Sequence, residues 1–196
     1  MKKSWIILGV IAIVVIILFM WIKGSYNSMV VQGETVTTAW ANVESQYQRR
    51  VDLIPNLVNT VKGYAEFEKS TLTAVVEARA NATKVSINPQ NLNAESMKQF
   101  QQAQGQLSGA LSRLLVTVEK YPDLKANQNF LELQSQLEGT ENRIAVERRN
   151  FNEAVKIYNS NIKSFPTLIF AKSFGFEAKA YFEADAKAEE APKVQF

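Results

Sequence analysis

The chain opens with an unbroken apolar segment and then continues in helical periodicity. The uncharged run extends from Trp5 to Ile22. At ~1.5 Å per residue a helix of this length rises about 27 Å, close to the ~30 Å hydrocarbon core of a bilayer. Trp5 and Trp21 lie near its ends, where indole rings favour the headgroup level. The pattern therefore predicts a single N-terminal transmembrane anchor over residues 1–23.

Beyond the anchor, apolar residues recur at spacings of three and four, as on a helix with one buried face. The first such stripe runs from Val36 to Tyr64, and Pro55 lies within it. Proline lacks an N–H and clashes with the carbonyl four residues earlier, here that of Val51. We therefore expect either a kink or a break at this position, with helical character resuming at once and running through Ala80.

A loop and a second long helix follow. Residues 85–93 contain proline and several asparagines, which favour turns, and Asn93 is suited to cap the next helix at its N-terminus. The following apolar stripe extends from Met97 to Tyr121, with Gln104 as its only polar interruption. Tyr121 precedes a proline, which predicts the end of this helix.

The most regular helix is predicted for residues 127–164. An apolar residue recurs there every seven positions, at Phe130, Leu137, Ile144, Phe151 and Tyr158. We expect this seam to pack against a second set of apolar side chains, namely Trp40, Phe100, Leu107, Leu111 and Leu114. The pattern predicts an all-α bundle domain over residues 24–186.

The end of the chain is aromatic and then polar. Residues 167–186 hold five aromatic side chains, and Gly175 weakens any helix there. This segment either caps the bundle core as a further helix, which we favour, or faces a neighbouring subunit or the membrane interface. Residues 187–196 read as a polar tail.

Composition excludes several classes of function. The chain has no Cys and no His, so zinc–thiolate sites, histidine-based triads and the Glu-x-x-His di-iron pattern cannot be built. The net charge of +3 arises mainly from lysines flanking the anchor, so there is no basic surface for nucleic acid. We expect no enzyme activity, no cofactor and no metal site.

Charge also bears on orientation. Lys2 and Lys3 precede the anchor, whereas Lys23 is the only basic residue between the anchor and Arg49. The positive-inside bias places the N-terminus in the cytoplasm. The prediction is a single-pass protein of the inner (plasma) membrane with its bulk domain extracytoplasmic or periplasmic; the alternative is a cytoplasmic domain.

Charged residues interrupt two of the apolar stripes. Arg50 lies in the first, and Glu141 and Arg148 lie in the last. One hypothesis is a buried ion-pair layer that fixes helix register, with Asp52 or Glu44 as a further partner, because arginine pairs bidentately with carboxylates. The other is a binding site for a small anion or peptide. We favour the structural layer, since helix geometry explains the spacing without a ligand.

Several segments of the sequence resemble the LemA family of bacterial membrane-anchored proteins. The matching segments are YNSMV at 26–30, AWANVESQYQRRVDLIPNLV at 39–58, VKGYA at 61–65 and EGTENRIAVERRNFNE at 138–153. Phe67 stands where a histidine is common in relatives, so no metal role is carried over. The resemblance implies a long antiparallel four-helix bundle behind one membrane helix. It supplies no activity, and family descriptions tend to place the short N-terminus outside.

Two functional hypotheses follow. The first is a non-enzymatic, membrane-anchored scaffold or interaction protein that self-associates into a homo-oligomer, because a single anchor confines its copies to two dimensions. Its partners would be the lipid bilayer, further copies of the chain and a membrane protein still to be identified. The alternative is a sensor domain that binds a small anion or peptide at the arginine–glutamate layer.

Overall fold

The computed structural model describes residues 2–64 and 68–183, and all regular structure within these ranges is helical. The elements are α1 (Lys2–Lys62), α2 (Lys69–Lys84), α3 (Ala94–Val118), α4 (Pro122–Lys125), α5 (Gln128–Lys163), α6 (Leu168–Ala171) and the 3₁₀ turn η1 (Lys172–Phe174). The all-α prediction is confirmed for this part of the chain. The polar tail predicted for residues 187–196 lies outside it.

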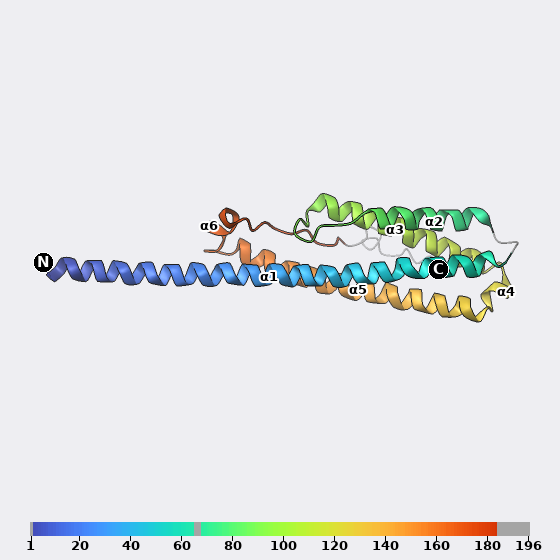
Figure 1. Ribbon diagram of the computed structural model, residues 1–196, viewed down its shortest axis with the longest axis horizontal. Helices are drawn as coiled ribbons and strands as arrows, with labels where there is room; N and C mark the ends of the chain where they lie inside the picture. Colours follow the sequence, from blue (N-terminus) through green and yellow to red (C-terminus); the bar gives the residue numbers. More distant parts are fainter. Residues whose placement is uncertain (1, 65–67, 184–196) are drawn as a thin grey trace, which may run out of the picture.

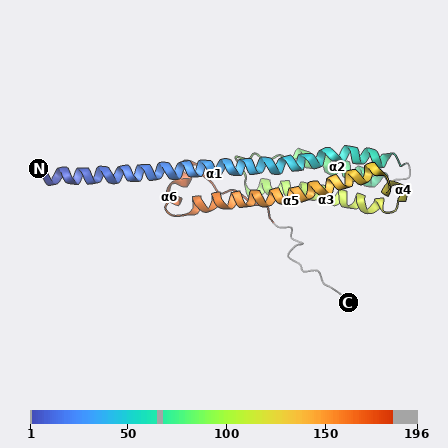
Figure 2. The same cartoon turned by 90° about the horizontal axis from the view of Figure 1, so that it is seen from below.

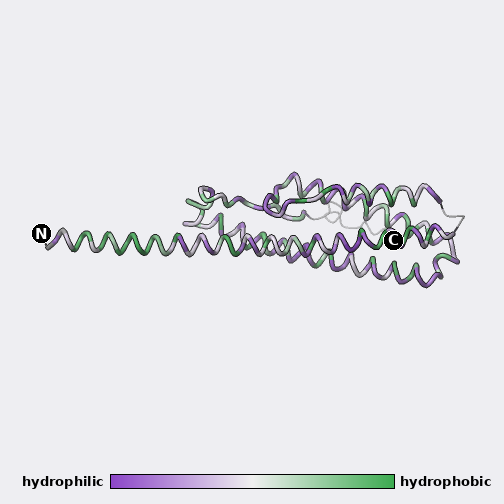
Figure 3. Tube along the Cα trace, viewed as in Figure 1, coloured by the Kyte–Doolittle hydropathy of each residue, from purple (hydrophilic) through white to green (hydrophobic). Residues whose placement is uncertain are grey.

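Helix α1 forms the axis of the molecule. Its N-terminal part projects alone beyond the other helices, and its C-terminal part runs along them (Figure 1). The projecting part is the most hydrophobic stretch of the trace (Figure 3). All side chains from Trp5 to Ile22 are exposed, and this helix is long and apolar enough to cross a membrane. Since the helix continues through Gly24, no linker separates anchor from bundle.

The long helices form two antiparallel pairs. Helix α5 lies along α1, and α2 lies along α3 (Figures 1 and 2). The direction of the first pair follows from two contacts at opposite ends. Asn161 Nδ2 donates to Gln32 Oε1 at 2.8 Å, whereas Asn127 Nδ2 donates to the Tyr64 hydroxyl at 3.1 Å. The residue number on α5 therefore falls as the number on α1 rises.

The seam predicted from the seven-residue repeat is confirmed. All ten of its members are buried, with exposed fractions of 8% or less: Phe130, Leu137, Ile144, Phe151, Tyr158, Trp40, Phe100, Leu107, Leu111 and Leu114. They belong to two apolar clusters rather than one. The cluster near the membrane contains Trp40, Phe100 and Phe151, and the distal cluster contains Leu107 and Leu137.

Pro55 does not break α1, which continues seven residues beyond it to Lys62. Proline has no N–H to donate to the carbonyl of Val51. Arg79 of α2 supplies the missing donor, since its Nε donates to the Val51 carbonyl oxygen at 3.1 Å. A side chain from a neighbouring helix thus satisfies the backbone group that proline leaves without an intrahelical partner.

Two helix starts follow the local rules. Asn93 accepts a hydrogen bond from the Ser96 N–H at 2.8 Å, which confirms it as the N-cap of α3. Asn127 caps α5 in the same way by accepting from the Phe130 N–H at 3.1 Å. The loop predicted for residues 85–93 is also confirmed.

The expectation of a further helix after residue 167 is wrong. Between residues 167 and 183 only α6 and η1 are helical, and Gly175, with φ of 82°, ends η1 in the left-handed region. Residues 176–183, which we call the strap, have no regular structure and run along the bundle toward its middle (Figure 1). The fourth long helix of the bundle is instead α2. The apolar pattern had predicted that residues of α2 continue the first helix through Ala80, but α1 ends at Lys62 and α2 begins at Lys69.

Candidate functional site

An arginine from α1 lies at the centre of the bundle. The Arg50 side chain is 2% exposed. Its Nη1 donates to Ser108 Oγ at 2.8 Å and to the Glu141 carboxylate at 2.9 and 3.2 Å. Its Nη2 donates to Gln104 Oε1 at 2.6 Å and more weakly to the Gln104 carbonyl at 3.4 Å. The guanidinium also lies 5.1 Å from the centre of the Tyr47 ring.

These four residues, Arg50, Gln104, Ser108 and Glu141, form what we call the arginine layer. They come from α1, α3 and α5, so one guanidinium links three helices. Gln104 and Ser108 lie four residues apart and hence on one face of α3. The layer falls between the two apolar clusters, because Tyr47 precedes it and Val51 follows it along α1.

The two charges of the layer differ in their access to water. Glu141 is 54% exposed, whereas Arg50 is buried. The carboxylate therefore keeps part of its hydration while the guanidinium depends on protein acceptors. Both terminal nitrogens of Arg50 are engaged within the chain, which suits a structural role, whereas its buried Nε has no hydrogen-bond partner among the described residues.

Arg148 and Asp52 do not join this layer, contrary to the expectation. Arg148 lies seven residues beyond Glu141 on the same helix, about 10.5 Å along the axis at ~1.5 Å per residue. Its Nη2 donates to the Glu183 carbonyl at 3.0 Å, and its guanidinium lies 4.8 Å from the Phe182 ring centre. Asp52 is exposed, two residues and thus about 200° around the helix from Arg50, and accepts from Gln48.

The structure adds Gln104 and Ser108, which the sequence did not place in the site. Gln104 carried a signal, because it is the polar interruption of an otherwise apolar stripe, and it is buried at 5% exposure. Ser108 carried no such signal, because a single serine on a helix is common at positions without any function. Glu44, the other partner considered for the layer, lies exposed on α1.

Two asparagines on α5 hold the strap. Asn159 exchanges two hydrogen bonds with the backbone of Lys179, at 2.8 and 2.9 Å. Asn152, seven residues earlier, does the same with the backbone of Phe182, at 3.0 and 2.9 Å. Each amide therefore pairs with the strap as a neighbouring strand would, and so satisfies backbone groups of a segment without regular structure.

The Phe182 ring closes the membrane-proximal cluster. It is 5% exposed, stacks on Trp40 with centroids 5.9 Å apart, and meets Phe151 edge to face at 5.4 Å. The adjacent Ala180 N–H donates to the Leu92 carbonyl at 2.9 Å. The strap thus connects the loop before α3 to α5 and covers the core between them.

Comparison with known proteins decides the family. The model of the LemA family matches residues 39–196. The chain belongs to the LemA family. The matched region contains every member of the arginine layer and the whole strap, while the anchor precedes it. The resemblance noted from the sequence is therefore confirmed.

Known relatives of this LemA-family chain include magnetosome proteins. It is similar to magnetosome protein MamQ 2 of Paramagnetospirillum magneticum, with 27% identity over 81% of this chain and 64% of the relative. It is similar to MamQ of Magnetospirillum gryphiswaldense at 28% identity, covering 80% and 64% of the two chains. Protein LemA of Metamycoplasma hominis is 24% identical over 93% of this chain and 80% of its own length. The chain thus spans about two thirds of the MamQ relatives, at 64% of their length.

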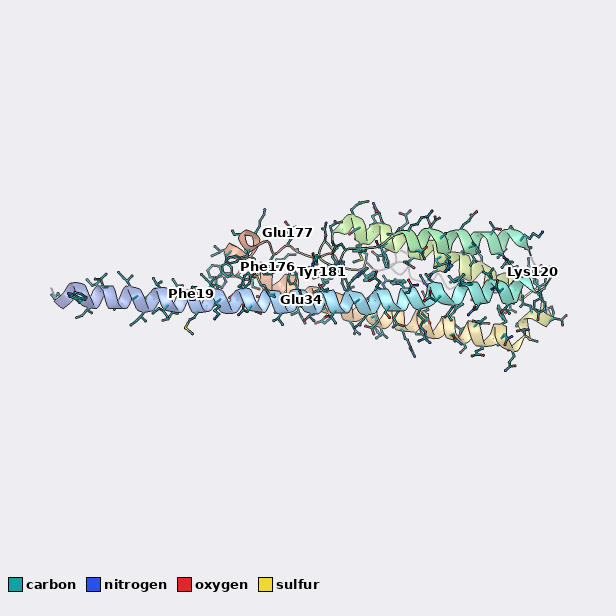
Figure 4. The ribbon with its side chains drawn as sticks, in the orientation of Figure 1. Phe19, Glu34, Lys120, Phe176, Glu177 and Tyr181 are labelled. Atoms are coloured by element: carbon teal, nitrogen blue, oxygen red, sulfur yellow. The ribbon has the colours of Figure 1, made fainter. Side chains whose placement is uncertain are left out.

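A polar cleft of about 380 Å³ lies beside the strap in this LemA-family structure. It is lined by α1, the loop before α3 and the start of the strap, where Glu34, Phe176 and Glu177 lie near one another (Figure 4). Lys179 Nζ donates there to the Pro89 carbonyl at 3.2 Å. Burial lowers the pKa of Lys179, and Glu34 partly opposes this effect.

Tyr158 forms another wall of the cleft. Burial raises the pKa of its phenol, and the negative charge of Glu177 raises it further. The Lys179 ammonium lies 5.7 Å from the centre of the Tyr158 ring. Among the described residues, no group of three or more Asp and Glu side chains could hold a metal ion. The polar lining of the cleft suits a small polar ligand.

Proposed function

We propose that this LemA-family chain is a non-enzymatic scaffold that is anchored in the membrane and self-associates there. The observation that carries the proposal is the continuity of α1 from Lys2 to Lys62. Because one helix serves both as anchor and as part of the bundle, the bundle begins at a set distance along the chain from the end of the anchor. Neighbouring copies would present the same faces at the same height, and confinement to the membrane plane makes weak lateral contacts effective.

A groove between α1 and α5 supports lateral contact. Its lining is mostly small or apolar and includes Val31, Thr35, Ala39 and Ala154. Val31 is 64% exposed, so an apolar side chain faces outward just beyond the membrane end of the bundle. Small side chains let two helices approach closely, which favours packing of a second copy along this groove.

The first test is the size of the intact chain in detergent or nanodiscs, combined with cross-linking. We expect particles well above the mass of one chain, and we expect a Val31→Cys variant to form cross-linked dimers with a short bifunctional maleimide. Val116→Cys is the matched control, because Val116 is equally exposed, at 69%, but lies on α3. A monodisperse single chain, or equal cross-linking at both positions, would reject self-association through this groove.

The alternative of a ligand sensor at the arginine layer has less support. Such a ligand would have to reach a guanidinium that is 2% exposed and already bonded to three side chains. The polar cleft at Lys179 offers a more accessible location for a small anion or peptide. Mutations in the arginine layer distinguish the two hypotheses. They should lower the free energy of unfolding if the layer is structural, whereas they should weaken ligand binding without changing stability if it is a ligand site.

For location we propose a single-pass protein of the inner (plasma) membrane with its bundle on the extracytoplasmic side. The support is the pair Lys2 and Lys3 ahead of the anchor against Lys23 alone behind it. A membrane-impermeant maleimide should label Ser86→Cys in intact cells, after permeabilisation of any outer membrane. Ser4→Cys, on the other side of the anchor, should react only after lysis. The reverse pattern would place the bundle in the cytoplasm.

A further inference from the structure

The turn between α5 and α6 carries an apolar tip that none of the described residues covers. Phe165 is 81% exposed, Leu168 is 57% exposed and Ile169 is 68% exposed. Three large apolar side chains within five residues form a patch, unlike the isolated exposed residues common on protein surfaces. Ala171, two residues after Ile169, is buried, so α6 packs on the bundle through one face and leaves the tip outside.

Contacts within the chain fix the height of this tip relative to the anchor. The Phe170 ring meets the Trp21 ring edge to face at 5.4 Å. Phe174, in turn, lies 5.7 Å from Phe170 and 5.4 Å from Tyr26. Trp21 is near the end of the uncharged span, where indole side chains lie at the headgroup level. Figure 1 shows α6 beside α1 at the point where the other helices end and the projecting part begins.

Along the chain, the charges on either side of the tip are of one sign. Between Glu153 and Glu177 there is no acidic residue, whereas Lys156, Lys163 and Lys172 all lie in this interval. Lys163 and Lys172 are exposed and flank the apolar tip on both sides. An apolar surface bordered by lysines is the composition of segments that lie in the interface of a membrane containing anionic lipids.

We propose that residues 165–169 insert into the interface of the same bilayer that α1 crosses, with Lys163 and Lys172 on anionic headgroups. The chain would then be held at two points, by the anchor and by this tip. Two points define the tilt of the bundle, which a lone helix cannot do, since tilt depends on interfacial anchors and neighbouring contacts. This inference depends on the anchor spanning the membrane and not on self-association.

Because the chain has no cysteine, single nitroxide labels can be placed on the full-length protein. We would reconstitute Ile169→Cys in vesicles of phosphatidylcholine with added phosphatidylglycerol and compare collisions with oxygen and with a water-soluble nickel chelate. Ile157→Cys is the matched control, an isoleucine 51% exposed on α5. We expect collisions of the residue 169 label with nickel to be severalfold fewer than those of the control, and its collisions with oxygen to be more frequent.

The same measurement identifies the other possible occupants of the tip. A residue 169 label that nickel reaches as readily as the control would show that the tip is in water. A label shielded from both reagents would show that a protein surface, such as a second copy, covers it. Either result overturns the proposal. Replacing Lys163 and Lys172 together by Gln should make the shielding at residue 169 insensitive to phosphatidylglycerol, whereas an unchanged response would remove the role assigned to the lysines.

Discussion

Replacing Glu141 with leucine is expected to lower the free energy of unfolding by about 2–3 kcal/mol. This lies between the ~1 kcal/mol of an exposed ion pair and the ~3–5 kcal/mol of breaking a fully buried one. The intermediate value follows from the geometry, because Glu141 is 54% exposed while Arg50 is 2% exposed. Without the carboxylate, the buried guanidinium keeps only the neutral oxygens of Gln104 and Ser108. Denaturant unfolding of the full chain in detergent measures the effect.

The double variant distinguishes a structural layer from a ligand site. Arg50→Met combined with Glu141→Leu should cost less than the sum of the two single changes, because no buried charge is left without its partner. Glu138→Leu, an exposed carboxylate of the same helix, should change stability by less than about 0.5 kcal/mol. Single variants that unfold like the unmodified chain would instead favour the sensor hypothesis.

Arg79→Met is expected to cost about 1–3 kcal/mol, which is the range for a hydrogen bond that involves a charged group or leaves a buried group unsatisfied. The reason is the carbonyl of Val51, which has lost its intrahelical donor to Pro55 and accepts from Arg79 Nε instead. Arg143→Met, at an exposed position on α5, provides the control for loss of an arginine alone. Equilibrium unfolding of each variant gives the comparison.

The decisive version of this experiment uses proline itself. In a Pro55→Ala background the N–H at position 55 is restored and can donate to the Val51 carbonyl. Arg79→Met should then cost clearly less than it does beside proline, so the two changes should be coupled. An equal cost in both backgrounds would mean that Arg79 acts through other contacts and that the carbonyl does not need it.

Features that depend on neighbours along the chain could be predicted before the structure was known. An uncharged run of sufficient length predicts the anchor helix, and the cap of α3 needs only Asn93 and the N–H three residues later. Helical periodicity also identified the buried faces of α1, α3 and α5, because burial of a stripe repeats with the turn of the helix. All ten predicted seam residues are buried for this reason.

The polar residues that interrupt these stripes could be identified from the sequence, but their interaction partners could be predicted only in part. Arg50 and Glu141 were expected to form an ion pair, and Arg50 Nη1 lies 2.9 Å from Glu141 Oε2. Arg148 was expected beside them and instead contacts the strap. Glu141 and Arg148 lie on the same face of α5, two turns apart. The sequence therefore does not show which of these turns lies beside Arg50. That choice depends on the axial offset between α1 and α5, which packing sets.

The continuity of α1 through Pro55 and the course of the residues after α6 depend on contacts between elements distant in sequence. A proline within a helix is tolerated where another helix supplies the lost donor, and the Arg79 that does so is distant in sequence. The strap has no regular structure and hence no periodic pattern in its sequence. Its backbone groups bond instead to the side-chain amides of Asn152 and Asn159 on α5. In both places the group that completes the hydrogen bonding comes from another element, so local preference could not predict the result.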